Sequence, residues 1–268
     1  MSLIALDIDG TVVDFDGNFT PEVQSRVLAA IDQGHQVVLA TGRPLVATLP
    51  VARTLGLRDA WLVCSNGSVT ARITPLGTSV IEDAQVFDPR PAFPLMEEFL
   101  GDSQIALEDV GRGYWVTGPF PTHLLHGEHT HVRLSELTVS QTVRIVVADA
   151  PERNLAFQNE MQALGLQDTY FGFGHSLWMD IAPLGVTKAS ALEKLRQAWG
   201  VAEGDTVAVG DGENDIEMLQ WAGFGVAMGH AVPELLTVAD AVTGSIAEDG
   251  LCAVLDNFLD AQQKQLWI

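Results

Sequence analysis

The chain has 268 residues, which is enough for a core domain plus a substantial insert, and 47% of them are hydrophobic, so nearly all of it should fold. A formal net charge of −21 argues against nucleic-acid binding, because phosphate backbones are bound through clustered Lys and Arg, and no such cluster occurs. No apolar run approaches the ~20 residues of a membrane span, and no basic leader is evident. We therefore expect a cytoplasmic protein, a monomer or small homo-oligomer, with small molecules and cations as partners.

Two side-chain types are scarce enough to be informative. Cys64 and Cys252 both lie in apolar contexts, which is typical of buried free thiols in a reducing compartment. Lysine occurs three times, as Lys188, Lys194 and Lys264. A basic residue beside an acidic motif therefore carries more information here than in an ordinary protein.

In the first third of the chain, short β-type runs that end in small or acidic residues alternate with helical patterns, as in a parallel sheet covered by helices. Thr20 and Pro21 fit a helix start, and Gly34 fits its end. A hairpin within 69–86 is expected to leave the core. The expected elements are a strand at 3–8, a helix from 21, a strand at 36–40, a helix to about 55 and a strand at 61–64.

The middle third changes character and suits an α+β insert with its own sheet. A helix at 187–199 and a strand at 206–209 then resume the earlier alternation. The expected elements of the insert are helices at 91–100 and 151–164 and strands at 104–107, 114–116, 142–148, 169–173 and 178–182. The predicted fold class is α/β, with a Rossmann-like parallel-sheet core and helices on both faces (1–83 and 184–268), plus an inserted α+β domain (84–183).

The first strand delivers two carboxylates, Asp7 and Asp9, into a turn at Gly10. Residues i and i+2 of a strand point the same way, so these acids are expected to face one reaction centre as nucleophile and acid/base. A calcium loop of this pattern would be entered from a helix and end in Glu, and neither feature is present. An Asp-rich turn that binds its own backbone remains the alternative.

Ligands of open parallel sheets lie beyond the carboxyl ends of the strands, so the polar strand ends should converge. Asp7, Asp9 and Asp211 would then form a carboxylate cluster that a hard cation neutralises, and oxygen-only ligands select Mg²⁺. Asp215 either supports this cluster or caps the helix that it opens. The sequence thus predicts a magnesium site.

Two further positions suit phosphate binding. Thr41 and Gly42 lie where a strand passes into a helix, so a hydroxyl and backbone amides can bind phosphate oxygens there. Lys188 lies at a helix start, an unfavourable place for a cation, which indicates an anionic partner. The alternatives are a hydroxyl that caps a helix and a surface lysine. Four histidines at 123, 126, 129 and 131 fit a solvated loop better than a transition-metal site.

The motifs resemble, in order and spacing, those of the haloacid-dehalogenase superfamily of phosphatases, and the Cof-type subgroup in particular. That subgroup carries a large α/β cap between its second and third motifs, where residues 84–183 lie. The chain departs from its pattern at His230 and Ala189, which stand where Asn and Gly are usual. The matching segments are 7–11 (Asp-Ile-Asp-Gly-Thr), 40–43 (Ala-Thr-Gly-Arg), Lys188, 210–219 (Gly-Asp-Gly-Glu-Asn-Asp-Ile-Glu-Met-Leu), 225–229 (Gly-Val-Ala-Met-Gly) and 239–250.

For the reaction, the resemblance implies that Asp7 forms an aspartyl-phosphate and also binds Mg²⁺. Asp9 is implied as the acid that protonates the leaving alcohol and the base that activates water, with its backbone carbonyl on the metal. Asp211 is implied as a further metal ligand, with Asp215 supporting the metal site.

For substrate binding, the resemblance implies that Thr41 and Lys188 hold phosphoryl oxygens and that Asn214 reaches phosphate or substrate. The resulting prediction is a Mg²⁺-dependent phosphatase of small phosphomonoesters, typically sugar phosphates. A phosphomutase on the same fold and a non-catalytic phosphate- or metal-binding regulator remain the alternatives. A phosphonate-cleaving enzyme would want a Schiff-base lysine in the cap, which has none.

Overall fold

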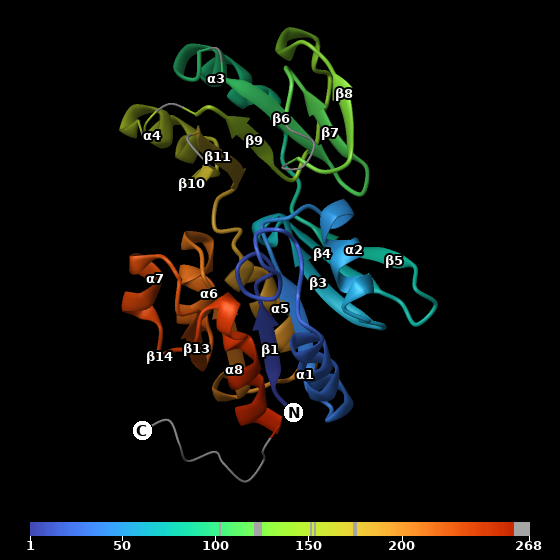
Figure 1. Cartoon of the computed structure of the whole chain (residues 1–268). Coiled ribbons are helices and arrows are strands. Elements are labelled where there is room, and N and C mark those ends of the chain that lie inside the picture. Colours follow the sequence, from blue (N-terminus) through green and yellow to red (C-terminus); the bar gives the residue numbers. More distant parts are fainter. Residues whose placement is uncertain (102, 121–124, 151, 153, 174–175, 260–268) are drawn as a thin grey trace.

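The computed structural model describes residues 1–101, 103–120, 125–150, 152, 154–173 and 176–259 (Figure 1). In this part of the chain, eight strands form one sheet in the order β14-β13-β12-β1-β2-β3-β4-β5. The strands from β14 to β3 pair in parallel, whereas β3, β4 and β5 pair antiparallel. The strands are β1 (Leu3–Leu6), β2 (Gln36–Ala40), β3 (Ala60–Cys64), β4 (Val69–Ile73), β5 (Ser79–Ala84), β12 (Thr206–Gly210), β13 (Phe224–Ala227) and β14 (Ala241–Val242).

The β4–β5 hairpin was expected to leave the core, and this expectation is wrong. All five residues of β4 pair with β3, so the hairpin extends the sheet at its edge. A strand edge with unpaired backbone groups is a ready site for a neighbouring strand, which explains why the hairpin docks there.

Helices cover both faces of this sheet. Apolar residues of α1, α2 and α8 pack on one face, and those of α5, α6 and α7 pack on the other. The predicted α/β class with a Rossmann-like core is therefore confirmed. The helices are α1 (Pro21–Asp32), α2 (Leu45–Thr54), α5 (Lys188–Trp199), α6 (Ile216–Trp221), α7 (Pro233–Val238) and α8 (Gly250–Leu259).

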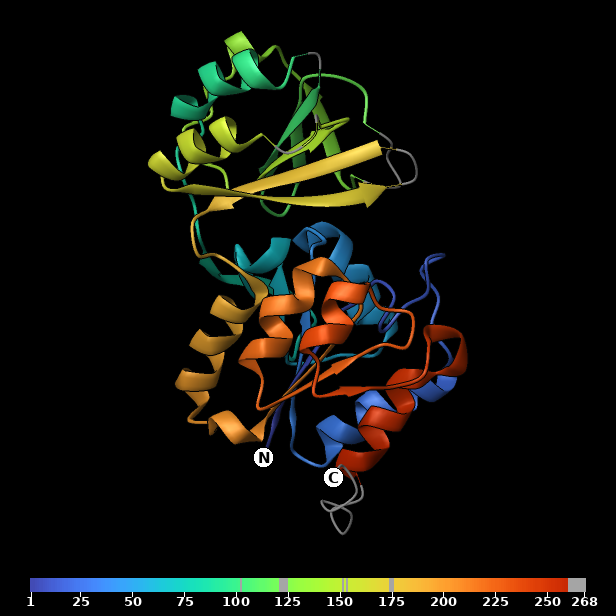
Figure 2. The same cartoon turned by 90° about the vertical axis from the view of Figure 1, so that its left-hand side faces the viewer.

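A second sheet has the order β10-β11-β9-β6-β7-β8, and helices α3 and α4 pack on one of its faces. Its opposite face is turned toward the first sheet (Figure 2). We call this part, with its two helices, the cap. Its elements are α3 (Phe93–Phe99), β6 (Gln104–Asp109), β7 (Gly113–Val116), β8 (Glu128–His131), β9 (Ile145–Ala148), α4 (Leu155–Ala163), β10 (Leu166–Phe173) and β11 (Ser176–Pro183).

β8 was not expected from the sequence, because Glu128–His131 is polar throughout and lacks an apolar alternation. The helix expected from 151 begins at Leu155, since the side chain of Asn154 accepts from the backbone N–H groups of Ala156 and Phe157. The division of the chain at residues 84 and 183 stays a prediction.

Two smaller expectations have clear outcomes. Cys64 and Cys252 are both buried free cysteines, as their apolar contexts predict. Among the described residues, no helix combines the length and the apolar character that crossing a membrane requires.

Candidate active site

Three carboxylates converge at the ends of two neighbouring strands. Asp7 follows β1 and Asp211 follows β12, and these strands pair in parallel with Leu6 opposite Val209. Asp215 lies one turn further on. One oxygen from each of Asp7, Asp211 and Asp215 lies within 4.8 Å of the others. The expected convergence of strand ends therefore holds for Asp7 and Asp211.

The ammonium of Lys188 lies between two of these acids. Its Nζ is 2.6 Å from Asp7 Oδ1 and 2.6 Å from Asp215 Oδ1, and its side chain is 1% exposed. Lys188 is the first residue of α5, where a cation is disfavoured by the helix dipole. The two carboxylates are the anionic partners that its position indicated.

Asp215 supports the carboxylate cluster, whereas the alternative that its side chain caps the helix it opens is wrong, because Asp215 makes no side-chain cap bond to α6. Its Oδ1 accepts from Lys188, while its Oδ2 accepts from the backbone N–H groups of Asp211 at 3.1 Å and Gly212 at 3.0 Å. The fully buried carboxylate thus orders the turn that presents Asp211. At the same time it belongs to the carboxylate cluster.

The cluster holds more negative charge than Lys188 can balance. Burial and the neighbouring Asp215 raise the pKa of Asp211 to about 7, and burial raises the pKa of Asp7 well above its usual range. Burial disfavours the ammonium of Lys188, but Asp215 and Asp7 outweigh this effect and raise its pKa.

A divalent cation fits this donor set. The available ligand atoms are all oxygens, and bringing a cation next to three crowded carboxylates relieves their repulsion. Glycine at position 10 lets the Asp211 carboxylate lie close to the backbone, because a Cβ at this residue would lie 2.1 Å from Asp211 Oδ2. Its φ of +77° also favours glycine.

Asp9 differs from the expectation that its carboxylate joins the cluster. Its Oδ2 accepts from Arg43 Nε at 2.8 Å, and Arg43 also donates to Oδ1. The side chain of Asp9 is 47% exposed, against 7% for Asp7. Period-two alternation failed here because the chain leaves β1 after Leu6 and turns before Asp9. Metal ligation by the backbone carbonyl of Asp9 involves a different atom and stays a prediction.

Thr41 and Gly42 lie at the end of β2, the strand next to β1. Thr41 is buried, and its Oγ1 accepts from the backbone N–H of Arg43 at 3.0 Å. A Cβ on Gly42 would lie 3.2 Å from Asn66 Oδ1 and 3.5 Å from Asn214 Nδ2. The loop is therefore packed against two amide side chains, of which Asn214 was expected at the site.

Sequence reasoning missed Asn66 as a site residue. Its Oδ1 accepts from Asn214 at 2.9 Å, and its Nδ2 donates to Asp180 of the cap at 3.1 Å. Ser65 and Asn66 have φ values of 51° and 53°, a left-handed conformation that non-glycine residues rarely adopt. The polar Ser-Asn-Gly sequence after β3 was the signal that could have identified it.

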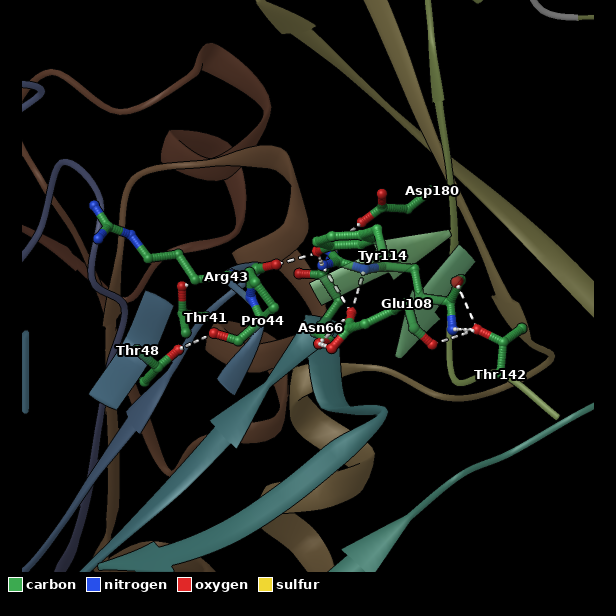
Figure 3. Close-up of polar contacts among 12 residues, drawn as sticks. Thr41, Arg43, Pro44, Thr48, Asn66, Glu108, Tyr114, Thr142 and Asp180 are labelled. Carbon is green, nitrogen blue, oxygen red and sulfur yellow. Dashed lines mark hydrogen bonds and ion pairs between the residues drawn. The ribbon is translucent and has the colours of Figure 1, made fainter. Parts of the chain in front are cut away.

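The cap contributes three buried charged residues that sequence reasoning also missed: Glu108, Arg144 and Asp180. Glu108 and Asp180 are labelled in Figure 3. Arg144 binds both carboxylates, at 2.9 Å and 3.0 Å. Ser65 of the core donates to Glu108 at 2.8 Å. Burial raises the pKa of Glu108 and of Asp180, although Arg144 opposes the shift. The available signal was a charged residue inside an apolar strand pattern.

A cavity of about 300 Å³ lies beside Lys188, between core and cap. Core residues Asn66 and Asn214 line it, and Gln167 and Thr169 of β10 line it from the cap. The wall thus presents amides and a hydroxyl next to the predicted phosphate-binding residues, together with the acids Asp168, Glu213 and Glu217.

None of the histidines that the structure describes belongs to the group of potential metal ligands. His230 Nε2 lies 3.4 Å from Asp211 Oδ2, and its Nδ1 accepts from the N–H of Ile246. Of the cap histidines, His123 lies outside the described residues. Among the residues that are described, the three aspartates make the only group with metal-binding potential.

Comparison with known sequences decides the family. The sequence model of haloacid dehalogenase-like hydrolases matches residues 4–255. The chain belongs to the haloacid dehalogenase-like hydrolase family. The resemblance found in the motifs is thereby confirmed, and with it the assignment to an enzyme class of phosphomonoester hydrolases.

Relatives and solved structures match nearly the whole chain of this hydrolase. YkrA of Bacillus subtilis, named as a phosphatase, is 28% identical, and the match covers 93% of this chain and 94% of YkrA. YcsE of the same organism, a 5-amino-6-(5-phospho-D-ribitylamino)uracil phosphatase, is 26% identical, covering 97% and 96%. The structure of the phosphatase BT1666 from Bacteroides thetaiotaomicron matches with a TM-score of 0.77 and 26% identity, covering 96% and 95%.

We predict that Lys188→Met destabilises the metal-free hydrolase by about 3–5 kcal/mol, because it leaves Asp7 and Asp215 buried without their cation. Lys194→Met is the matched control on the same helix, since its exposed ammonium pairs with Asp83 and should contribute about 1 kcal/mol or less. Urea denaturation in EDTA measures both. Equal losses in the two variants would contradict the buried role of Lys188.

Proposed function

We propose that the protein is a Mg²⁺-dependent phosphatase that hydrolyses small phosphomonoesters through an aspartyl-phosphate on Asp7. The observation that carries this proposal is the buried contact of Asp7 with Lys188 inside a group of three carboxylates at the strand ends. Phosphoryl transfer mainly needs a positioned nucleophile and neutralised charge, and this arrangement supplies the first and requires a cation for the second.

Asp7, Asp211 and Asp215 are the side chains that would hold the cation, together with the backbone carbonyl of Asp9. Bound there, Mg²⁺ would neutralise charge on the phosphoryl group and on the aspartates. Lys188 keeps Asp7 Oδ1 in a fixed orientation at 2.6 Å, so the nucleophile is positioned before substrate arrives.

Asp7 attacks phosphorus, and the ester oxygen departs with a proton from Asp9. Water then attacks the aspartyl-phosphate while Asp9 takes up its proton, which releases phosphate and restores both carboxyl groups. Both oxygens of Asp9 accept from Arg43, so one must leave the guanidinium before it carries a proton. The half-exposed Asp9 has the freedom for this movement.

Thr41, Gly42, Lys188 and Asn214 are the proposed phosphate- and substrate-binding residues. Thr41 contributes a hydroxyl and Gly42 a backbone amide at the strand end, and Lys188 contributes a buried positive charge. Asn214 already donates to Asn66 and lines the cavity beside Lys188. This placement supports binding of the ester between core and cap.

The proposed substrate class is small phosphorylated metabolites with a polyhydroxylated leaving group, such as sugar phosphates. The hydroxyl of Thr169 on the cavity wall can hydrogen-bond a substrate hydroxyl. The amides of Gln167 and Asn66 are each bonded within the protein, and each keeps one N–H for a further acceptor. The relative YcsE acts, by its name, on a phosphorylated ribityl compound.

The chemistry is tested by measuring inorganic phosphate released from p-nitrophenyl phosphate and a panel of sugar phosphates, with Mg²⁺ or EDTA. We expect Mg²⁺-dependent release that falls by at least about a thousandfold in Asp7→Asn, because the nucleophile is lost. Asp16→Asn, on the exposed segment just beyond, should keep wild-type activity. Phosphorylated products without free phosphate would favour the mutase, and no turnover by folded protein would favour the regulator.

The raised pKa of Asp211 predicts how metal binding depends on pH. In the unfolded chain this carboxyl titrates near pH 4, and in the metal-free fold near pH 7, so its ionisation destabilises the fold as pH rises between these values. We expect the metal-free melting temperature to fall over this range and added Mg²⁺ to raise it more at pH 8 than at pH 5. Thermal melts at each pH measure this. A Mg²⁺ shift of equal size at both values would contradict it.

A further inference from the structure

The side chain of Arg144 reaches from the cap into the core. Arg144 directly precedes β9 and pairs through its backbone with Glu108 of β6, so its Cα belongs to the cap sheet. Its Nη1 donates to the backbone carbonyl of Gly42 at 2.7 Å. Gly42 belongs to the proposed phosphate-binding loop, and the side chain of Arg144 is 5% exposed. A buried charge of the cap is thus bonded to backbone at the reaction site.

Each nitrogen of this guanidinium has an acceptor. Nε donates to Glu108, Nη1 donates to Gly42 and Asp180, and Nη2 lies 2.8 Å from the hydroxyl of Tyr114 and 2.9 Å from Glu108. Three of these partners lie on cap strands, and Gly42 lies on the core. Because the donors of arginine form a rigid planar fork, the carboxylates of Glu108 and Asp180 fix where Nη1 points, and the Tyr114 hydroxyl adds only a second contact for Nη2.

The peptide group between Gly42 and Arg43 connects Arg144 to the hydroxyl of Thr41. Its carbonyl accepts from Arg144, and its N–H donates to Thr41 Oγ1 at 3.0 Å. A hydroxyl that accepts from a backbone N–H keeps its own proton for another acceptor. Fixing the peptide plane therefore directs the hydroxyl proton of Thr41 away from the loop.

We propose that Arg144 is a positioning residue, which fixes the Gly42–Arg43 peptide when the cap is seated and so orients the Thr41 hydroxyl toward a phosphoryl oxygen. This inference rests on the proposed function. The same peptide leads into Arg43, whose side chain binds Asp9, so both a phosphate-binding group and the acid/base depend on it.

A simpler role for Arg144 would be to neutralise Glu108 and Asp180, both of which are buried. The two roles make different demands. Charge neutralisation needs any cation, so lysine would serve, whereas positioning needs donors in several fixed directions, which one ammonium cannot supply. Arg144→Lys therefore separates them.

The test compares wild type, Arg144→Lys and Tyr114→Phe in two assays with Mg²⁺ present: phosphate release and calorimetric binding of inorganic phosphate. We expect Arg144→Lys to lower kcat about tenfold or more and to weaken phosphate binding about tenfold, which equals about 1.4 kcal/mol. Tyr114→Phe removes one bond to the same guanidinium but spares Gly42, and should stay within about twofold of wild type in both assays.

If Arg144→Lys folds poorly by circular dichroism, Arg144→Ala with millimolar guanidinium replaces it, and guanidinium should restore phosphate binding. Wild-type affinity for phosphate in Arg144→Lys, or equal losses in Tyr114→Phe, would overturn the inference. A wild-type protein that hydrolyses no ester but binds phosphate more tightly than Arg144→Lys would overturn the proposed function and leave the positioning role supported.

Discussion

Lys188 places a buried ammonium 2.6 Å from two carboxylates that lie far apart in the sequence, Asp7 and Asp215. Removing charges from water is costly unless each one is paired, so these side chains hold the first strand, the turn after β12 and the start of α5 together. The remaining carboxylate, Asp211, is left without a cation of its own in the cluster, and its pKa rises to about 7. This excess of buried negative charge favours the binding of a cation at the cluster.

The cap adds a second buried polar layer above the first. Asn214 binds Asn66, Asn66 binds Asp180, and Asp180 binds Arg144, so an unbroken series of hydrogen bonds runs from the core turn to the cap sheet. Buried networks of this kind are stabilising only when their members are well paired, which ties their geometry to a seated cap. An open cap would break the bonds to Asn66 and Ser65 and return those groups to water. Arg144 also donates to the Gly42 carbonyl, so the position of the cap is linked to the shape of the proposed phosphate-binding loop.

Strand ends were the part of this site that sequence alone could predict. Parallel strands place their carboxyl ends at one edge, so Asp7, Thr41 and Asp211 could be brought together from the strand pattern without knowing any contact. The position of the Asp9 carboxylate could not be predicted in this way, because the turn after β1 breaks the alternation and Arg43 binds this carboxylate. The apolar pattern and the turn residues likewise predicted most helices and strands, but not β8, which has no apolar face.

The buried charged residues of the cap could not be predicted for a different reason. Glu108 and Asp180 lie on the separate strands β6 and β11, and Arg144 directly precedes a third strand, β9. Their pairing depends on the antiparallel register of the cap sheet, which no short motif specifies. A buried charge inside an apolar strand marks a partner, but it does not say which one. Only the fold reveals that the partner of Arg144 includes a backbone carbonyl of the core.

The most direct test of the account is to identify the residue that carries the phosphoryl group. Asp9→Asn should slow hydrolysis of the intermediate more than its formation from p-nitrophenyl phosphate, whose leaving group needs little protonation. After an acid quench, mass spectrometry of peptides should find the phosphoryl group on the peptide that contains Asp7, and Asp7→Asn should lack it. The account would be contradicted if the wild type releases phosphate but neither the wild type nor Asp9→Asn carries a phosphoryl group on that peptide.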